Sequence, residues 1–145
     1  MSHYSRDDFN LTDNVGFAIV KARNLVMEQM DAALKDLNVR AHHVGIFMSL
    51  LRGKDTTPAT LSRYLGIDTG LMTRTLDKLE TLGMVKRSRS TDDRRMVNLE
   101  LTEAGREVAL RIAGIAPDVL NTRLQYFSKA EFEELQRLLR KFLND

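Results

Sequence analysis

The chain has 145 residues, of which 43% are hydrophobic, a formal net charge of +2 at pH 7, and no cysteine. This length and hydrophobic content suit one domain with an adequate core and argue against a disordered chain. The absence of cysteine excludes disulfides, thiolate metal sites, cysteine nucleophiles and peroxide sensing by a reactive thiol.

The sequence shows neither a membrane-spanning segment nor an export signal. No apolar run approaches the roughly 20 residues that a transmembrane helix needs. Residues 1–10 are polar, apart from Tyr4 and Phe9, and they lack the basic start and apolar stretch of a signal peptide. We therefore expect a cytoplasmic protein that has no membrane partner.

Charge is distributed unevenly along the chain. Residues 61–95 hold eight basic and five acidic side chains, whereas residues 1–40 hold five basic and six acidic ones. The net charge of +2 is too small to indicate nucleic-acid binding by itself. The excess of basic residues in the middle of the chain is therefore more informative than the total.

Residues 11–37 have the pattern of one long helix, with Thr12 or Asp13 as its N-terminal cap. Apolar residues recur along one face of this helix: Val15, Ile19, Ala22, Val26, Met30, Ala33 and Leu37. Phe17, Leu25 and Met27 lie off that stripe. A helix that is apolar on more than one side needs more than one partner, so we expect part of it to pack on a second protomer.

A break at residues 38–42 precedes a short helix over about residues 41–52, which Gly53 ends. Thr57 is placed to cap the next helix, with Pro58 at its first position, and Gly66 stops that helix after residues 61–65. A further helix begins after Asp68 and ends at Gly83. Two helices separated by so short a turn predict a helix-turn-helix motif.

The second helix of this motif has two distinct faces. One face is an apolar stripe of Leu71, Met72, Thr75, Leu76, Leu79 and Leu82. The other carries short polar or basic groups able to reach the groove edges and phosphates of DNA: Thr69, Gly70, Thr73, Arg74, Asp77 and Lys78. We interpret this helix as a recognition helix. The alternative for Arg74 is an ordinary surface arginine that pairs with Asp77.

After Gly83 the apolar period changes from that of a helix to two. Residues 84–87 and 96–101 then form two strands of a β-hairpin around a tip at residues 88–95, which predicts the wing of a winged helix-turn-helix. Between residues 86 and 95 the net charge is +3. The basic residues are Lys86, Arg87, Arg89, Arg94 and Arg95.

Two helices are predicted after the wing. Thr102 caps the first, with Glu103 in its first turn, and Pro117 inside it predicts a kink or a break near Ala116. Ser128 begins the second, which has Glu131 as the partner in a capping box and runs to the end of the chain.

The last 20 residues hold more apolar surface than one short helix needs to bury against its own domain. The residues concerned are Leu124, Phe127, Phe132, Leu135, Leu138, Leu139, Phe142 and Leu143. Dimerisation through the interlocking N- and C-terminal helices of two chains explains this surface. The alternative is that these residues only fill the core of the monomer.

Several short motifs occur in order: Ile67-Asp68, Thr73-Arg74, Leu76-Asp77-Lys78-Leu79, Gly83-Met84-Val85-Lys86-Arg87, Asp93-Arg94-Arg95 and Leu101-Thr102-Glu103-Ala104-Gly105. With them the chain resembles the MarR family of bacterial transcription regulators. The resemblance covers nearly the whole chain in length and helix order, although its specific motifs lie within residues 61–105. It implies a mainly α, single-domain fold over residues 1–145. A winged helix-turn-helix at 38–105 would lie between the two parts of a helical dimerisation region, residues 1–37 and 106–145.

The resemblance also implies a function, that of a homodimeric repressor which binds a pseudo-palindromic operator in double-stranded DNA. The DNA-binding residues would be Thr69, Gly70, Thr73, Arg74, Lys78, Arg89, Arg94 and Arg95. It assigns Arg95 to the minor groove, with Asp93 placed to orient it. Two alternatives remain: Arg94 and Arg95 form only a solvated hairpin tip, or the winged helix is a ligand-independent module that binds protein.

The family often binds aromatic acids, so a small aromatic or phenolic acid is the expected ligand. It would lie between the dimer helices and the winged domain, near Phe17, Arg23, His42, His43, Phe47, Met48 and Met72. The other interpretation of the two histidines is as core or surface residues. Adjacent helical residues point about 100° apart and rarely share one metal ion. Motifs of catalytic sites are absent, so we expect no enzyme activity, metal or cofactor.

Overall fold

The structure is a computed structural model that describes residues 1–53, 57–93 and 95–145. The order of its elements is that of a mainly α winged helix-turn-helix, as predicted. The elements are helices α1 (Val15–Ala33), α2 (Val44–Leu51), α3 (Pro58–Leu65), α4 (Thr69–Thr81), α5 (Glu103–Leu124) and α6 (Lys129–Leu143), the short 3₁₀ helices η1 (Lys35–Leu37) and η2 (Ala41–His43), and the antiparallel strands β1 (Val85–Arg89) and β2 (Val97–Leu101).

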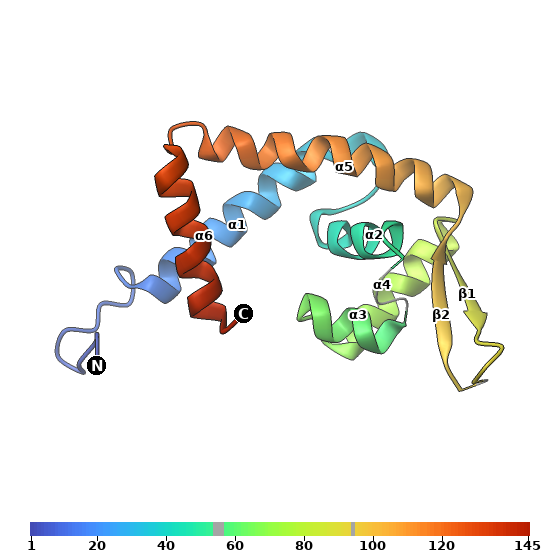
Figure 1. Ribbon diagram of the computed structural model, residues 1–145, viewed down its shortest axis with the longest axis horizontal. Coiled ribbons are helices and arrows are strands. Elements are labelled where there is room, and N and C mark those ends of the chain that lie inside the picture. The colour runs from blue at the N-terminus through green and yellow to red at the C-terminus, as the bar shows by residue number, and fades with distance from the viewer. Residues whose placement is uncertain (54–56, 94) are drawn as a thin grey trace.

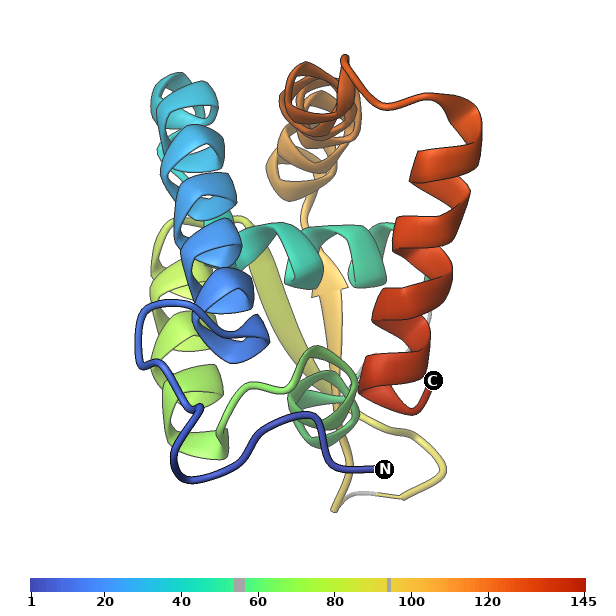
Figure 2. The same ribbon diagram turned by 90° about the vertical axis from the view of Figure 1, so that its left-hand side faces the viewer.

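Helix α5 lies along one side of the molecule, and α2, α3, α4 and the hairpin lie beneath it (Figure 1). Helix α1 packs against α5, and α2 packs against both α5 and β2. Helix α6 turns back from the end of α5, and Figure 2 shows it on the opposite side of the molecule from α1. The crossing of α1 and α6 in Figure 1 is therefore only a projection.

One hydrophobic core lies inside the winged helix-turn-helix and sets the orientation of α4. Its most deeply buried side chains are Leu34, Ile46, Phe47, Leu61, Met72, Leu76, Leu79, Val85, Leu99, Ala109 and Ile112. The core thus takes in the end of α1 and the first half of α5. The N-terminal half of α1 and all of α6 contribute no buried residue.

Four of the predicted N-terminal helix caps are confirmed. Thr57, Thr102 and Ser128 each accept a hydrogen bond from the backbone N–H three residues on. Asp68 accepts two at the start of α4, from the N–H groups two and three residues on, at 2.9 and 3.1 Å. Gly66 ends α3 in the left-handed conformation, with φ 64°, which a side chain would disfavour. The caps at Gly66 and Asp68 hold the short turn between α3 and α4.

The first helix differs from the prediction at both ends. It begins at Val15, and its cap is Asn14, whose side-chain oxygen accepts from the N–H of Phe17 at 2.9 Å. The amide nitrogen of Asn14 also donates to the main-chain oxygen of Asn10 at 2.8 Å. This local bonding holds the preceding residues in a turn, so Thr12 and Asp13 do not cap the helix. At the other end, η1 replaces the last helical turn.

Two other boundaries also differ. Strand β1 continues to Arg89, which pairs with Val97, so the tip is formed by residues 90–96. A kink or a break was predicted near Ala116, and the break does not occur, since α5 continues through Pro117 as one helix. A proline inside a helix costs roughly 3 kcal/mol. Its neighbours Ile115, Ala116 and Val119 pack against the core, and their burial offsets this cost.

Within the described ranges, no helix combines the length and the apolar character needed to cross a membrane.

Candidate nucleic-acid interface

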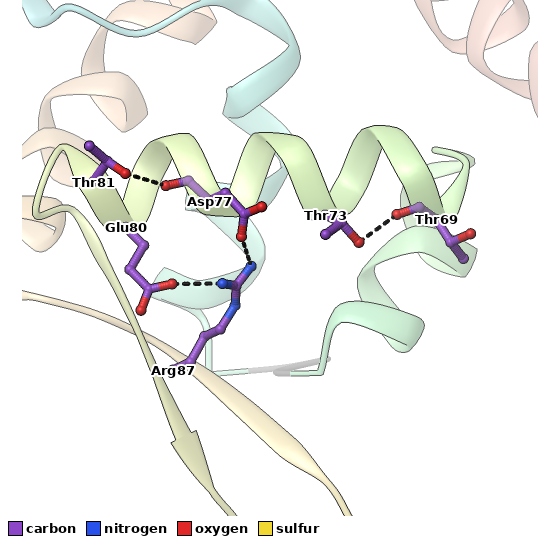
Figure 3. A network of polar contacts seen from close by, with 6 residues as sticks. All are labelled: Thr69, Thr73, Asp77, Glu80, Thr81 and Arg87. Atoms are coloured by element: carbon purple, nitrogen blue, oxygen red, sulfur yellow. Dashed lines mark hydrogen bonds and ion pairs between the residues drawn. The ribbon is translucent and has the colours of Figure 1, made fainter.

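The outer face of α4 is held away from the protein because its inner face is buried. Met72, Thr75, Leu76 and Leu79 are buried in the core. The other face is exposed over the first two turns, where Thr69, Thr73 and Arg74 lie. The hydroxyl of Thr73 donates to the main-chain oxygen of Thr69 at 2.9 Å, so it stays close to the helix (Figure 3). Leu71 and Leu82, which were predicted in the apolar stripe, are exposed instead.

Arg74 lies next to Gly70 on this face. A Cβ added to Gly70 would lie 3.5 Å from Nη1 of Arg74, which is an ordinary van der Waals contact. In the part of the chain that the structure describes, no carboxylate lies within ion-pair distance of Arg74. Asp77, its expected surface partner, pairs with Arg87. The guanidinium therefore remains available for an anionic partner.

Lys78 lies apart from the first turn of α4. Its charge acts on His42 and His43, which belong to the segment before α2. The structure thus brings Thr69, Gly70, Thr73 and Arg74 together, and it places Lys78 further along the same helix.

The wing is a two-stranded hairpin whose tip closes with backbone hydrogen bonds. The N–H of Ser90 donates to the oxygen of Met96 at 2.9 Å. Asp93 accepts from the backbone N–H of Arg95 at 3.0 Å through its side chain, so it orients the main chain of Arg95 and not its guanidinium. Arg89 and Arg95 are exposed. The predicted site residue Arg94 lies outside the described residues.

The base of the wing is anchored on the start of α5. Thr102 donates from its hydroxyl to the oxygen of Gly83 at 2.6 Å and from its N–H to the oxygen of Met84 at 3.1 Å. Gly105 packs directly on Met84, where an added Cβ would overlap the main-chain oxygen and lie 2.8 Å from the carbonyl carbon. Sequence reasoning gave no role to Gly105. The sequence feature that could have indicated this role is the Leu-Thr-x-x-Gly motif, which ends at Gly105.

A second connection joins the wing to α4. Arg87 of β1 donates from Nη2 to Oδ1 of Asp77 at 2.8 Å and from Nη1 to Oε2 of Glu80 at 2.7 Å (Figure 3). Lys86, which points to the other face of the strand, pairs with Glu100 of β2 at 3.2 Å.

Arg87 and Glu80 were not among the predicted site residues. Nothing in the sequence pattern shows which carboxylate an arginine of the wing pairs with.

His43 is a structural residue at the junction between α1 and α2. It is 1% exposed, and its Nδ1 accepts from the backbone N–H of Arg40 at 3.0 Å. Asp31 of α1 holds the same loop by accepting from the N–H of Ala41 at 2.6 Å and by pairing with Arg40 at 3.0 Å. Burial, followed by the charge of the neighbouring His42, lowers the pKa of His43 to about 4. This geometry supports the core interpretation of His43.

This pKa makes a prediction for stability. His43 takes up a proton near pH 6.5 in the unfolded chain but only near pH 4 in the folded one, so its contribution to stability is lost as the pH falls through this window. The full difference is about 3 kcal/mol. His43→Asn keeps a side-chain oxygen that can accept from Arg40 and cannot titrate. We expect its free energy of unfolding, measured in urea between pH 7 and 4.5, to fall less than that of the wild type. Equal slopes would contradict this assignment.

The residues predicted to surround a ligand divide into two groups. Phe47 and Met72 are buried in the core, and Met48 packs partly against it. Phe17 is 42% exposed on α1, and Arg23 of the same helix donates to Asn24 at 3.2 Å. His42 is exposed, and its ring lies 4.2 Å from that of His43. Among the described residues, no three His, Cys, Asp or Glu side chains form a cluster that could hold a metal ion.

Comparison with known proteins agrees with this geometry. Residues 35–96 match the model of the MarR family. The transcriptional repressor MprA of Escherichia coli is 30% identical over 115 residues, a match that covers 76% of this chain and 65% of MprA. The chain therefore matches somewhat less than two thirds of the length of this curated relative.

Two solved structures share the fold. A mutant MarR from Escherichia coli complexed with operator DNA has a TM-score of 0.81 at 24% identity, over 93% of this chain and 99% of that one. BpsR of Bordetella bronchiseptica, described with a mechanism for regulation of its DNA binding by 6-hydroxynicotinic acid, has a TM-score of 0.82 at 19% identity, over 94% and 98%. These relatives are regulators, not enzymes. By its motifs, its family match and its fold, the chain belongs to the MarR family.

Proposed function

We propose that the chain is a homodimeric transcription regulator that binds double-stranded operator DNA through α4 and the wing. The observation that carries this proposal is the common placement of two elements with exposed cations, Arg74 on the outer face of α4 and Arg95 on the wing. Helix α4 and the tip of the hairpin lie on the side of the core opposite α5 (Figures 1 and 2). A duplex laid on this side would receive α4 in a major groove and the wing tip, with Arg95, in the neighbouring minor groove.

The second part of the proposal is the dimer. No residue of α6 is buried, although its sequence is strongly amphipathic. Its exposed apolar residues are Phe132, Leu138, Leu139, Phe142 and Leu143. Further exposed apolar residues lie on α1, at the end of α5 and just after it: Val15, Phe17, Val20, Leu120 and Phe127. This argues against the alternative in which these residues only fill the core of the monomer. A second copy of the chain, related by a two-fold axis, would cover the same surface on both protomers.

We place one boundary between the two regions at the end of η1 and the other inside α5. Residues 38–105 would bind DNA, and residues 1–37 and 106–145 would form the dimer. Both outer segments also pack against the proposed DNA-binding region, because Leu34, Ala109 and Ile112 are buried in the same core. A dimer built in this way would present two copies of α4 to a pseudo-palindromic operator.

The third part of the proposal is regulation. MprA is named a repressor, and the DNA binding of BpsR is regulated by 6-hydroxynicotinic acid. We extend both properties to this chain: it would repress by blocking the access of polymerase, and a small aromatic or phenolic acid would release it. The ligand would bind where the dimer helices meet the winged domain and favour a spacing of the two α4 helices that no longer fits successive major grooves.

The test is operator affinity as a function of salt, measured on DNA from upstream of the protein's own gene. Arg74→Ala is expected to weaken binding by about 1–3 kcal/mol at particular base pairs if it contacts a base edge, or uniformly if it holds phosphate. Arg95→Ala is expected to weaken binding most on flanks rich in A and T, where a narrow minor groove attracts a cation, and its effect should shrink at high salt.

Arg111→Ala is the matched control, because it removes the same charge from an exposed position of α5, a helix that contains none of the proposed DNA-binding residues. All three variants should keep the melting temperature of the wild type, since the three side chains are exposed. Release from the same DNA by saturating aromatic acids tests the ligand. Salt-insensitive binding to protein alone would refute the proposal and favour a protein-binding module. Wild-type affinity of Arg95→Ala at low salt would reduce the wing tip to a solvated hairpin.

A further inference from the structure

Arg87 lies on the face of the wing that is turned towards α4. It lies on the same face of β1 as Val85, which is buried, and its partner across the hairpin is Leu99, which is also buried. Its side chain is 30% exposed, whereas that of Lys86 on the outer face is 60% exposed. The guanidinium therefore extends from a packed strand into the space beside the recognition helix (Figure 3).

Both free ends of this guanidinium are occupied by α4. Nη1 reaches Glu80 at 2.7 Å and Nη2 reaches Asp77 at 2.8 Å. The two carboxylates lie three residues apart, on neighbouring turns of one helix face. A planar guanidinium with a ligand on each side resists rotation, which a lysine ammonium would not, because lysine presents a point charge on a flexible chain. The contact thus restrains the direction of the strand as well as its distance from α4.

The position of this contact along the hairpin matters. The base of the wing is anchored at Met84 by Thr102 and Gly105. Arg87 lies between this anchor and the tip at residues 90–96, so the two attachments together fix a direction. The burial of Val85 and Leu99 also holds the lower half of the hairpin in the core, and Arg87 adds a polar attachment where the hairpin leaves the core towards its exposed tip. A tilt at the base is amplified at the tip, where Arg95 lies.

We propose that Arg87 is a positioning residue: its clamp on Asp77 and Glu80 sets the angle between the recognition helix and the wing, so that the tip reaches the groove next to the one that α4 enters. This inference rests on the proposed function for the use of that angle. Arg87 itself does not bind DNA, because its donors are directed to the two carboxylates. The clamp also neutralises part of the negative charge that Asp77 and Glu80 place beside a duplex.

A double-mutant cycle between Arg87 and Arg95 tests the inference. If Arg87 acts through the placement of the tip, Arg87→Ala should lower operator affinity about tenfold in the wild type but less than about twofold in the Arg95→Ala background. Additive losses in the two backgrounds, with the salt slope reduced by about 1, would show instead that Arg87 binds phosphate directly. Arg87→Lys should keep the charge and lose much of the effect of the clamp.

Removing the two carboxylates separates positioning from simple repulsion. Asp77→Asn with Glu80→Gln removes two negative charges near DNA, so electrostatics alone would tighten binding to every sequence. The clamp predicts weaker binding to the operator than in the wild type, with no such loss on scrambled DNA. Glu100→Gln is the matched control, since it breaks the ion pair on the outer face of the same hairpin and should change operator affinity by less than about twofold.

A distance measurement tests the clamp without DNA. The natural chain has no cysteine, so spin labels attached after Thr73→Cys on α4 and Thr91→Cys at the tip report one distance, once labelled protein is diluted with unlabelled protein. Arg87→Ala should broaden the distribution of this distance while circular dichroism stays that of the wild type. An unchanged distribution would overturn the clamp. If the wild type shows no preference for operator DNA, the proposed function fails, and the distance still decides whether the clamp holds the wing.

Discussion

Deletion of residues 127–145 is expected to abolish operator binding. Helix α6 has no buried residue of its own, yet one of its faces is apolar from Phe132 to Phe142. If that face is half of a dimer interface, its loss leaves a monomer or an aggregate. Two half-sites about one helical turn apart must be read together. The second contact is intramolecular in a dimer, so losing it costs roughly 10²- to 10⁴-fold in affinity.

A point variant shows whether this loss comes from the interface or from misfolding. Phe142→Glu places a negative charge on the apolar face of α6. Lys141→Glu is the matched control, because it introduces the same side chain at the neighbouring, polar position. Both positions are exposed in the single chain, so neither change should unfold it. We expect Phe142→Glu to halve the mass measured by sedimentation and to lose operator binding, whereas Lys141→Glu should remain a dimer. A truncated, well-folded monomer with full operator affinity would refute the dimer.

Gly105→Ala is expected to destabilise the fold by about 3 kcal/mol, at the upper end of the range for overpacking. The new Cβ would overlap the main-chain oxygen of Met84. Backbone cannot rotate away as a flexible side chain does, so the start of α5 and the base of the wing must separate. Separation would also strain the two hydrogen bonds that Thr102 makes to Gly83 and Met84. Operator affinity should fall with stability, because the base of the wing moves.

Gly114→Ala, in the same helix, is the matched control. A Cβ at Gly114 meets nothing within 4 Å, and alanine is favoured over glycine in a helix by about 1 kcal/mol. We therefore expect this variant to be neutral or slightly more stable in urea denaturation. A Gly105→Ala protein as stable as the wild type would show that the two backbones separate at little cost.

The local features of this chain could be predicted from its sequence. Thr57, Asp68, Thr102 and Ser128 cap their helices through bonds to residues two or three positions away, so the information lies within one turn. The change of apolar period after Gly83 predicted the wing for the same reason. One local prediction was wrong: Thr12 or Asp13 was expected to cap the first helix, but Asn14 does so. Several side chains that can cap a helix lie within a few residues there, and the sequence pattern does not show which of them does.

The candidate site was predicted in part. Family resemblance indicated Arg74 and Arg95, and the structure leaves both side chains exposed. It could not indicate that Asp93 bonds the backbone of Arg95, since a carboxylate two residues away can reach either the main chain or the guanidinium. The choice depends on the shape of the turn, which the order of residues does not specify.

Tertiary structure alone decided how the elements are joined. The sequence determined that α4 and the wing form, but the contacts of Arg87 with Asp77 and Glu80 span ten and seven residues. The approach of Gly105 to Met84 spans a whole hairpin. The passage of α5 through Pro117 also overrode a local preference. Local periodicity reports which face of an element is apolar, whereas the partner of each side chain depends on how packed elements lie in the core.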